Sequence, residues 1–272
     1  MDNRPVGFFD SGLGGLTALA AFKELLPAEN IIYFGDTANC PYGVKTLDEL
    51  NRLAENNLRF LASFGCKAVL AACGTVASNS MAVLNSFPLP VFNVLTSSTE
   101  KMASIPGDAP LAVLATEASI RAGAFKNGIS ALCGGKREVL GVACQDFVEL
   151  CENGHTDKKD PLLAAAVEKY LSPLKSTGVE AVLLGCTHFG IIEDAIKAFL
   201  GDGVQIVSAS GCGAEALAGY IRANGLEGSG GSERYFTSGD TKAFDSMASV
   251  ILKDEYRAHA EHTDRVQDEC RP

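Results

Sequence analysis

The chain has 272 residues, of which 47% are hydrophobic and 21% are charged, and its formal net charge is −10. This length accommodates one large or two modest domains, since a domain takes roughly 150 residues. The composition is that of an ordinary folded protein rather than a disordered one. The negative charge argues against a nucleic-acid partner, because such binding requires Lys and Arg side chains that neutralise phosphates.

The N-terminus carries no apolar segment of the kind that directs secretion, and no run approaches the roughly 20 apolar residues that span a bilayer. We therefore expect a cytoplasmic protein with no membrane contact. The nine cysteines are odd in number and form no C-x-x-C pair. The sequence thus predicts reduced thiols rather than a disulfide framework or a zinc ribbon.

Short apolar, β-branched runs alternate with longer segments of helical periodicity. Strands are predicted at 6–9, 31–34, 68–72, 91–94, 111–115, 138–143, 181–185, 205–209 and 234–237. Helices are predicted at 15–26, 46–64, 76–86, 118–131, 160–176, 190–200, 212–224 and 241–252. Apolar strands that are separated by helices indicate parallel sheets covered on both faces, so the predicted fold class is α/β.

Polar or reactive side chains follow several of these strands. In parallel sheets, ligands bind beyond the carboxyl ends of the strands, where loops and helix N-termini converge. We therefore expect a site near Asp10 and Ser11, Asp36 and Thr37, Cys73 and Thr75, Thr116, Cys186 with Thr187 and His188, and Ser208.

Most of these residues also have a structural interpretation when each is taken alone. A lone Asp before Ser and Gly is usually a turn or N-cap residue, and a lone Cys after a strand is usually a small buried hydrophobe. The glycines of DSGLGG do not match the dinucleotide motif, and no Walker A pattern occurs. Cys186 and His188 fall short of the four ligands of a structural zinc, and His259 and His262 lie in a charged tail that we expect to be solvated. We expect neither a cofactor nor a metal.

Two of the cysteines share a particular setting. AACGTVAS and LLGCTHFG place Cys73 and Cys186 each at the end of an apolar strand and before a predicted helix. A helix N-terminus lowers the pKa of a thiol from its free value of about 8.5, which increases the thiolate fraction near neutral pH. Two such thiols, facing each other across a cleft, could each act as acid or base.

The motifs FDSGLGGLT, YFGDTANCPYG, AACGTVAS and LLGCTHFG, with FTSGD near the end, resemble those of the glutamate racemases in the aspartate/glutamate racemase superfamily. The resemblance extends from about residue 6 to about residue 252. It implies two similar three-layer α/β domains, with mainly parallel sheets and the active site in the cleft between them. The first domain would take residues 1–96 and 209–272, and the second residues 97–208.

The family implies a reaction without a cofactor, in which one cysteine removes the α-proton of glutamate and the other returns a proton from the opposite face. Matching by motif makes Cys73 the base for D-glutamate and Cys186 the base for L-glutamate. Asp10 resembles the carboxylate that assists Cys73, and His188 resembles the imidazole that serves Cys186. The segment CQDFVELCENG places Glu152 at a third assisting position.

The resemblance also assigns residues to the substrate, whose two carboxylates must be held although the cysteine motifs contain no Arg or Lys. Backbone N–H groups at helix starts and hydroxyl groups can bind such anions. The matched positions are Ser11, Tyr42, Gly43, Gly74, Thr75, Thr116, Ser119 and Thr187, with Asp36 as a structural or proton-network carboxylate. The family further implies a homodimer that supplies D-glutamate for bacterial peptidoglycan.

One position departs from the family pattern in a way that bears on substrate choice. Gly74 stands where the family usually has an Asn that contacts the substrate, and the lost amide could cost roughly a few kcal/mol of binding. Two alternatives therefore stay open: a racemase of the same superfamily that acts on another amino acid such as aspartate, and a catalytically weak regulatory protein that binds amino acids. Thiol hydrolysis by Cys186 and His188 is disfavoured, since catalytic Cys and His are usually distant in the chain.

Overall fold

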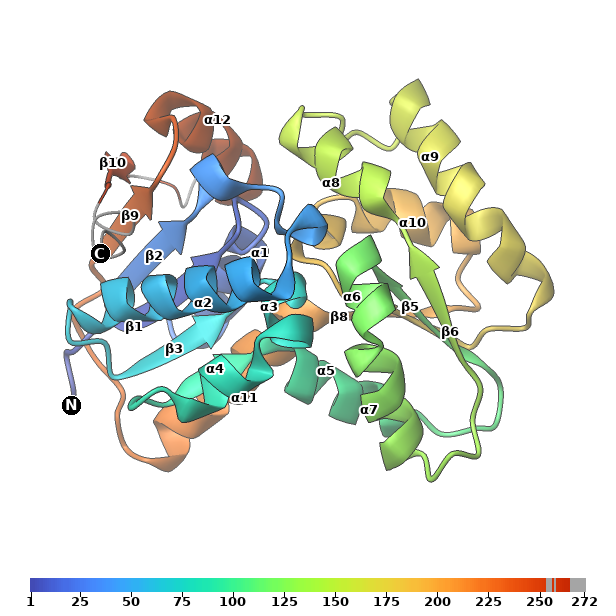
Figure 1. Ribbon diagram of the computed structural model, residues 1–272, viewed down its shortest axis with the longest axis horizontal. Coiled ribbons are helices and arrows are strands. Elements are labelled where there is room, and N and C mark those ends of the chain that lie inside the picture. The colour runs from blue at the N-terminus through green and yellow to red at the C-terminus, as the bar shows by residue number, and fades with distance from the viewer. Residues whose placement is uncertain (253–255, 257, 265–272) are drawn as a thin grey trace.

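The computed structural model describes residues 1–252, 256 and 258–264. Within them, ten strands form two sheets that lie side by side, and every pair of neighbouring strands is parallel (Figure 1). The first sheet has the order β10-β9-β2-β1-β3-β4, and the second has the order β6-β5-β7-β8. The predicted α/β fold with mainly parallel sheets is confirmed.

The nine predicted strands are all present, and each bound differs from the prediction by at most one residue. The strands of the first sheet are β1 Val6–Asp10, β2 Ile31–Gly35, β3 Ala68–Ala71, β4 Val91–Asn93, β9 Glu233–Thr237 and β10 Glu261–His262. Those of the second sheet are β5 Leu111–Ala115, β6 Val139–Ala143, β7 Ala181–Leu184 and β8 Gln205–Ser208.

Helices cover both faces of each sheet. The α-helices are α1 Leu16–Leu25, α2 Leu47–Ala62, α3 Gly74–Asn79, α4 Met81–Ser86, α5 Val94–Ala103, α6 Glu117–Ala122, α7 Ala124–Leu132, α8 Gln145–Glu152, α9 Pro161–Leu171, α10 Glu193–Leu200, α11 Ala209–Ala223 and α12 Thr241–Leu252. The 3₁₀ helices are η1 Thr37–Asn39, η2 Tyr42–Val44, η3 Ser172–Ser176 and η4 Thr187–Gly190.

The three layers follow from the two-residue period of the strands, which sends successive side chains to opposite faces. In the first sheet, Phe8 packs with residues of α1, α11 and α12, and its ring lies 5.2 Å from that of Phe22. Phe9 points the other way, into the cluster with α2 and α4. In the second sheet, Leu114 packs with residues of α8, α9 and α10, whereas Val113 packs with residues of α5 and α7.

Several predicted helices are interrupted where local chemistry competes with the helix. The helix expected at 118–131 is divided at Gly123, which has a φ of 70° and ends α6 in the left-handed conformation that favours glycine. The helix expected at 76–86 is two helices, α3 and α4. The Asn79 side chain donates to the Thr75 carbonyl, a local bond of the kind that competes with the helix backbone.

Two helices, α5 and α8, were not predicted. The first begins at Asn93, whose side-chain oxygen accepts from the N–H groups of Leu95 and Thr96 and so caps the helix. The sequence of α5 is rich in Ser and Thr, so its apolar residues did not show a clear helical periodicity. In α8, Phe147, Val148 and Cys151 form a buried stripe with helical spacing that was available in the sequence.

The expected division of the chain at residues 96/97 and 208/209 stays a prediction, although the sheets draw on different parts of the chain. The first sheet uses strands from 6–93 and 233–262, and the second uses strands from 111–208. His259 and His262 in the charged tail are exposed, as expected, and the tail also contributes the edge strand β10. Arg234 donates to Glu261 of this strand, and the Thr263 N–H donates to the Thr237 carbonyl. Cys270 lies outside the described residues. None of the described helices has the length and apolar character needed to cross a membrane.

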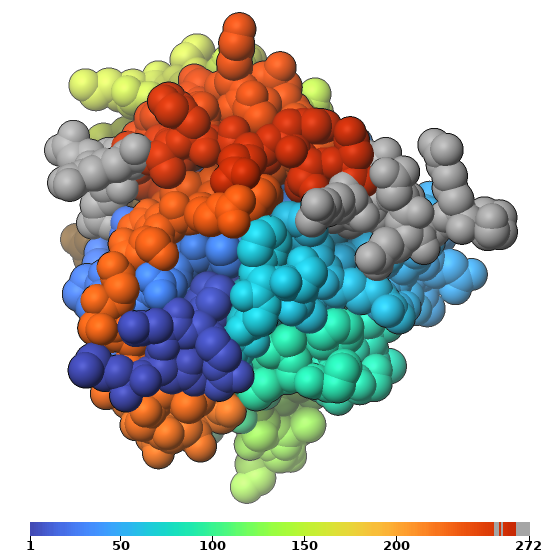
Figure 2. Space-filling view, turned by 90° about the vertical axis from the view of Figure 1, so that its left-hand side faces the viewer, coloured from blue at the N-terminus to red at the C-terminus, as the bar shows by residue number. Residues whose placement is uncertain are grey.

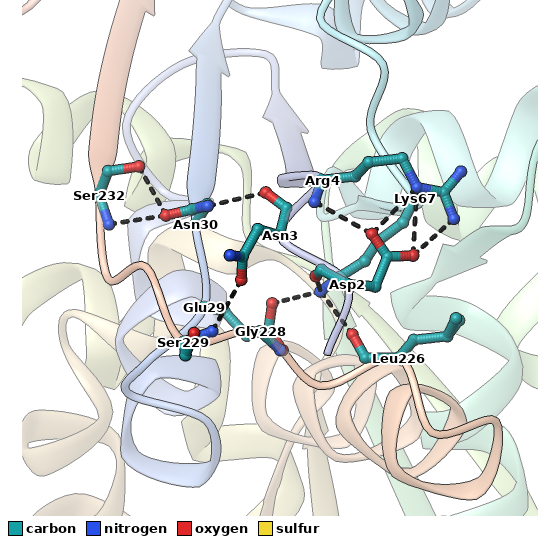
Figure 3. Close-up of polar contacts among 10 residues, drawn as sticks. All are labelled: Asp2, Asn3, Arg4, Glu29, Asn30, Lys67, Leu226, Gly228, Ser229 and Ser232. Carbon is teal, nitrogen blue, oxygen red and sulfur yellow. Dashed lines mark hydrogen bonds and ion pairs between the residues drawn. The ribbon is translucent and has the colours of Figure 1, made fainter.

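A buried lysine, Lys67, bonds to three separate segments of the chain near the amino-terminal ends of the strands of the first sheet (Figure 3). Lys67 precedes β3, and its side chain is completely buried. Its ammonium group donates to Glu29 at 2.5 Å, to the Asp2 carbonyl at 2.8 Å and to the Leu226 carbonyl at 2.7 Å, so all three N–H groups have acceptors. On the surface, the N-terminus and the segment that leads into β9 consequently lie side by side (Figure 2).

We predict that Lys67→Met lowers the free energy of unfolding by about 3–5 kcal/mol, because it leaves the buried Glu29 carboxylate without its cation. Denaturant unfolding measures this change. The matched control is Lys169→Met, whose partner Asp146 is 51% exposed, and its expected cost is about 0–1 kcal/mol. Equal costs for the two variants would contradict the prediction.

Candidate active site

The ends of strands from both sheets meet at one pocket. It is lined by Ser11, Cys40, Pro41, Tyr42, Gly43, Cys73, Gly74, Thr75, Thr116, Gln145, Val148, Cys186, Thr187 and His188. Hydrogen bonds cross from one half to the other: the Thr75 and Thr116 hydroxyls are 3.0 Å apart, and the Thr187 hydroxyl donates to Asp10 at 3.2 Å. The structure therefore brings both motif cysteines to one pocket between the sheets.

Cys73 lies between the end of β3 and the start of α3, and it is 4% exposed. Its thiol donates to the Ser11 hydroxyl at 3.6 Å. Burial raises the pKa of Cys73 to about 12, the Asp10 charge adds to this, and the Val76 N–H and Ser11 hydroxyl act in the opposite direction. The expectation that a helix N-terminus increases the thiolate fraction is wrong for Cys73, because desolvation outweighs the six-residue helix α3.

Cys186 also departs from the expected setting. It follows β7 but enters the 3₁₀ helix η4, and the helix α10 begins only at Glu193. Its sulfur is 3.8 Å from Nδ1 of His188, and the other ring nitrogen of that histidine is 2.5 Å from Oε1 of Glu152. The local partner of this sulfur is therefore an imidazole rather than the start of an α-helix.

The His188 ring is buried, whereas Glu152 is about a quarter exposed. Burial acts to lower the pKa of His188, but the hydrogen bonds and charges of Cys186 and Glu152 prevail and hold it well above its ordinary value. Burial acts to raise the pKa of Glu152, and the His188 imidazolium prevails and lowers it. The positive charge of this ring therefore lies beside the Cys186 sulfur.

Asp10 ends β1 and is completely buried. It accepts from the Gly12 N–H at 3.0 Å and from the Thr187 hydroxyl of the other half. Burial raises the pKa of its carboxyl, although the positive charge of His188 and the N–H groups of Gly12 and Gly15 act to lower it. A carboxyl in this environment can hold or release a proton near Cys73.

Three of the predicted site residues stand behind the pocket lining and contact residues that form it. Asp10 contacts Thr187, Glu152 contacts His188, and Ser119 accepts from the Thr116 hydroxyl at 3.0 Å. The lining contains the other ten predicted residues, Ser11, Tyr42, Gly43, Cys73, Gly74, Thr75, Thr116, Cys186, Thr187 and His188.

Asp36 has a structural role in the wall of the pocket. It accepts from the Tyr42 hydroxyl at 2.5 Å, from the Asn39 amide at 3.0 Å and from the Ser238 hydroxyl at 2.6 Å. The Tyr42 hydroxyl also accepts from the Asn57 amide. This hydroxyl therefore donates to Asp36 and accepts from Asn57 at the same time.

Two residues expected near the site serve other parts of the fold. Ser208 caps α11 by accepting from the Gly211 N–H, and Thr37 bonds to Thr237 of β9.

Sequence reasoning missed four lining residues: Cys40, Pro41, Gln145 and Val148. Gln145 begins α8 directly after β6, and its side-chain oxygen accepts from the Glu117 N–H at 3.3 Å. Its place after a strand was the available signal, since strand ends collect site residues. Val148 lies three residues further along α8, so this unpredicted helix supplies both residues.

Residues 16–217 match the family described as Asp/Glu/Hydantoin racemase. A glutamate racemase from Desulforudis audaxviator is 34% identical over 257 residues, which cover 91% of this chain and 93% of that protein. A glutamate racemase isoform from Bacillus anthracis has a similar structure, with a TM-score of 0.90 and 27% identity over 97% of this chain and 98% of that one. A Francisella tularensis glutamate racemase, solved in complex with D-glutamate, gives a TM-score of 0.88 and 30% identity over 97% and 99%.

Two parallel α/β halves with a thiol from each at a shared pocket define a protein of the racemase class. The chain belongs to the Asp/Glu/Hydantoin racemase family, as its motifs predicted.

The His188–Glu152 pair predicts a pH-dependent contribution to stability. Because the pKa of His188 is raised on folding, its protonation contributes to the free energy of unfolding. This contribution is complete below pH 6.5, the ordinary pKa of histidine, and is lost as the pH rises through the raised pKa. The lowered pKa of Glu152 gives a second contribution to the free energy of unfolding. This contribution is present above pH 4.5, the ordinary pKa of glutamate, and is lost as the pH falls through the lowered pKa. The pair therefore contributes most between about pH 4.5 and 6.5.

We expect Glu152→Gln to lower the free energy of unfolding most in this interval, and the difference from wild type to shrink as the pH rises through the pKa of His188. Urea unfolding over a pH series measures it, and an NMR titration should show a lower pKa for His188 in the variant. Glu149→Gln, an exposed change on the same helix, is the control. An unchanged His188 titration in Glu152→Gln would contradict the assignment.

Proposed function

We propose that this protein interconverts L-glutamate and D-glutamate without a cofactor, by proton transfer at the α-carbon between two thiols. The observation that carries the proposal is the meeting of Cys73 and Cys186 at one pocket, each from a different half of the molecule. An enzyme that inverts a stereocentre needs a base on one side of the carbon and an acid on the other. Because the two enantiomers have equal energy, similar groups suit both positions.

The reaction begins with one sulfur as thiolate and the other as thiol. The α C–H bond breaks as the thiolate takes the proton, the electron pair stays on the α-carbon and its carboxylate, and the thiol on the opposite side delivers its own proton. The raised pKa of Cys73 keeps that sulfur protonated near neutral pH, and the charged ring of His188 lies 3.8 Å from the Cys186 sulfur. For L-glutamate, Cys186 acts as the base and Cys73 as the acid, and D-glutamate uses the reverse.

The supporting groups divide between the two sulfurs. Asp10 serves Cys73, since a carboxyl with a raised pKa can exchange a proton in a buried site. His188 serves Cys186 directly. Glu152 is a positioning residue, because it acts through the His188 ring rather than on the substrate.

The substrate carboxylates would be held by hydroxyl groups and backbone N–H groups. Within the part of the chain that the structure describes, the pocket lining offers Ser11, Thr75, Thr116 and Thr187 rather than Lys or Arg side chains. Hydroxyls and N–H groups at helix starts bind anions in this way. The Francisella tularensis relative was solved with D-glutamate, which supports glutamate as the substrate here.

The proposal extends to the setting in the cell. It includes a homodimer in the cytoplasm that supplies D-glutamate for bacterial peptidoglycan, all of which follows from the resemblance to the family. Sedimentation equilibrium of the purified protein measures the assembly.

We predict that Cys73→Ala and Cys186→Ala each reduce glutamate inversion by at least about 10⁴-fold, since each removes a group that transfers a proton. Circular dichroism follows the inversion of L- and D-glutamate with no added cofactor. Cys133→Ala is the control, because this thiol lies at the end of α7 and should leave the rate unchanged. Substantial inversion by either active-site variant would refute the two-thiol mechanism.

In D₂O, the wild-type protein should place deuterium at the α-carbon of the inverted product, because the delivered proton comes from an exchangeable thiol. Mass spectrometry of the separated enantiomers measures it. Glutamate binding in calorimetry without any deuterium incorporation would favour a regulatory binding protein instead. Product formed without deuterium would exclude proton delivery from a solvent-exchanged thiol.

A further inference from the structure

Within the part of the chain that the structure describes, the pocket lining holds one side-chain amide, that of Gln145. This lining offers no Lys or Arg side chain, so a substrate with two carboxylates has to be bound by neutral donors and by His188. Gly74 stands where the family usually has an Asn that contacts the substrate, and it provides no side-chain donor. The Gln145 amide is therefore the side-chain amide that a bound substrate can meet in this chain.

One hydrogen bond determines which end of the Gln145 amide is free. Gln145 begins α8, and its Oε1 accepts from the Glu117 N–H of α6 at 3.3 Å. A backbone N–H bonds to the oxygen of an amide and not to its nitrogen, so the nitrogen is the other end. Among the described residues, no hydrogen bond from this nitrogen is found. Its two N–H donors are consequently available to a ligand.

The free nitrogen lies at the boundary between the two halves. A Cβ placed on Gly43 would lie 3.0 Å from Oε1 and 3.4 Å from Nε2 of Gln145. Gly43 belongs to the half that contains β1 and β3, whereas Gln145 follows β6 of the other half. Because both residues line the pocket, a ligand bound between the halves meets this amide.

The two thiols determine which end of the substrate lies near Gln145. In the proposed reaction, the α-carbon lies between the sulfurs of Cys73 and Cys186. The α-carboxylate is bonded directly to that carbon, so it meets the hydroxyls that follow the thiols in the chain, those of Thr75 and Thr187. Gln145 reaches the pocket from α8, which carries neither of these thiols. The side-chain carboxylate, at the other end of glutamate, is therefore the acceptor for its amide.

We propose that Gln145 is a specificity-determining residue whose amide N–H donates a hydrogen bond to the side-chain carboxylate of glutamate. This inference rests on the proposed function, because it names the group that recognises the distal end of the proposed substrate. A hydrogen bond to a carboxylate is about twice as strong as one to a neutral amide. The Gln145 amide thus favours glutamate over glutamine, which has the same shape but no charge at that end.

The variant that tests this contact is Gln145→Glu, which keeps the shape of the side chain. One carboxylate oxygen can still accept from the Glu117 N–H, so the bond between α8 and α6 is retained. The other oxygen replaces the donor with a negative acceptor, which repels the side-chain carboxylate of glutamate and accepts from the amide of glutamine. At about pH 8, well above the ordinary Glu pKa of about 4.3, this side chain is ionised.

We expect Gln145→Glu to raise the KM for glutamate by at least about 100-fold, and to raise the inhibition constant of glutamine much less. Circular dichroism measures both, with glutamine as the competitor of glutamate inversion. A residue that only positioned α8 would not change the preference between two ligands that share their α-carboxylate and amino group.

Gln145→Leu removes the amide without adding a charge, and it also serves if Gln145→Glu fails to fold. We expect its KM for glutamate to rise by about 10–100-fold, because a hydrogen bond to a charged group is lost. Its kcat should change much less, since the contact lies away from the α-carbon and is the same in the ground state and the transition state.

Gln205→Glu is the matched control, because it makes the same change at an exposed position. Gln205 begins β8, whereas the pocket lies at the carboxyl ends of the strands. The KM for glutamate and the inhibition constant of glutamine should both equal those of wild type.

An unchanged preference for glutamate over glutamine in Gln145→Glu, or equal losses for the two ligands, would overturn the role of Gln145. Absence of glutamate inversion in the wild-type protein would instead overturn the proposed function. The two failures are distinguishable, because calorimetry compares glutamate and glutamine binding even in a protein that does not invert glutamate.

Discussion

The contact between the two halves at the carboxyl ends of their strands is the constraint on which the site depends. Each thiol is held by its own sheet, and the cores of the two sheets are separate clusters of buried side chains. The relative position of the sulfurs is therefore decided where the halves touch. Gly74 contributes to that contact, because it places no Cβ against the Gly185 carbonyl oxygen.

Burial of the ionisable groups gives the site its electrostatic character. Cys73, Asp10 and His188 are all buried, and charge in such surroundings is stabilised only by direct partners. His188 has its partners in Glu152 and Cys186, so it holds a proton. Cys73 has a hydroxyl and a nearby carboxyl instead, so its thiol form is favoured. The two sulfurs thus differ in their immediate partners although they share a chemistry.

A pocket lined by buried residues also suits the chemistry of an α-carbanion. Excluding water strengthens the electrostatic interactions of the negative charge that develops during proton transfer. Hydroxyl groups such as those of Thr75 and Thr116 bridge the halves and line the pocket at the same time. The hydroxyl groups that we propose to hold the substrate carboxylates therefore also bond the two halves to each other.

The strands and the pocket were predictable to different degrees. All nine apolar runs became strands, because a buried parallel strand requires a continuous apolar sequence. Helix bounds were less predictable, since Gly123 and Asn79 end helices through local conformation and hydrogen bonding. α8 was missed, and with it Gln145 and Val148 in the pocket lining.

The sequence by itself determined that Cys73 and Cys186 end strands of parallel sheets, because the apolar runs and the residues that follow them are local properties. Only the tertiary structure decided that Glu152 meets His188, that Ser119 stands behind Thr116, and that Gly74 rests on Gly185. It also decided the direction of the Cys73 pKa, which the helix start alone predicted wrongly. The physical reason is that burial and close backbone contacts arise from packing between distant segments, and no local pattern encodes the distance between them.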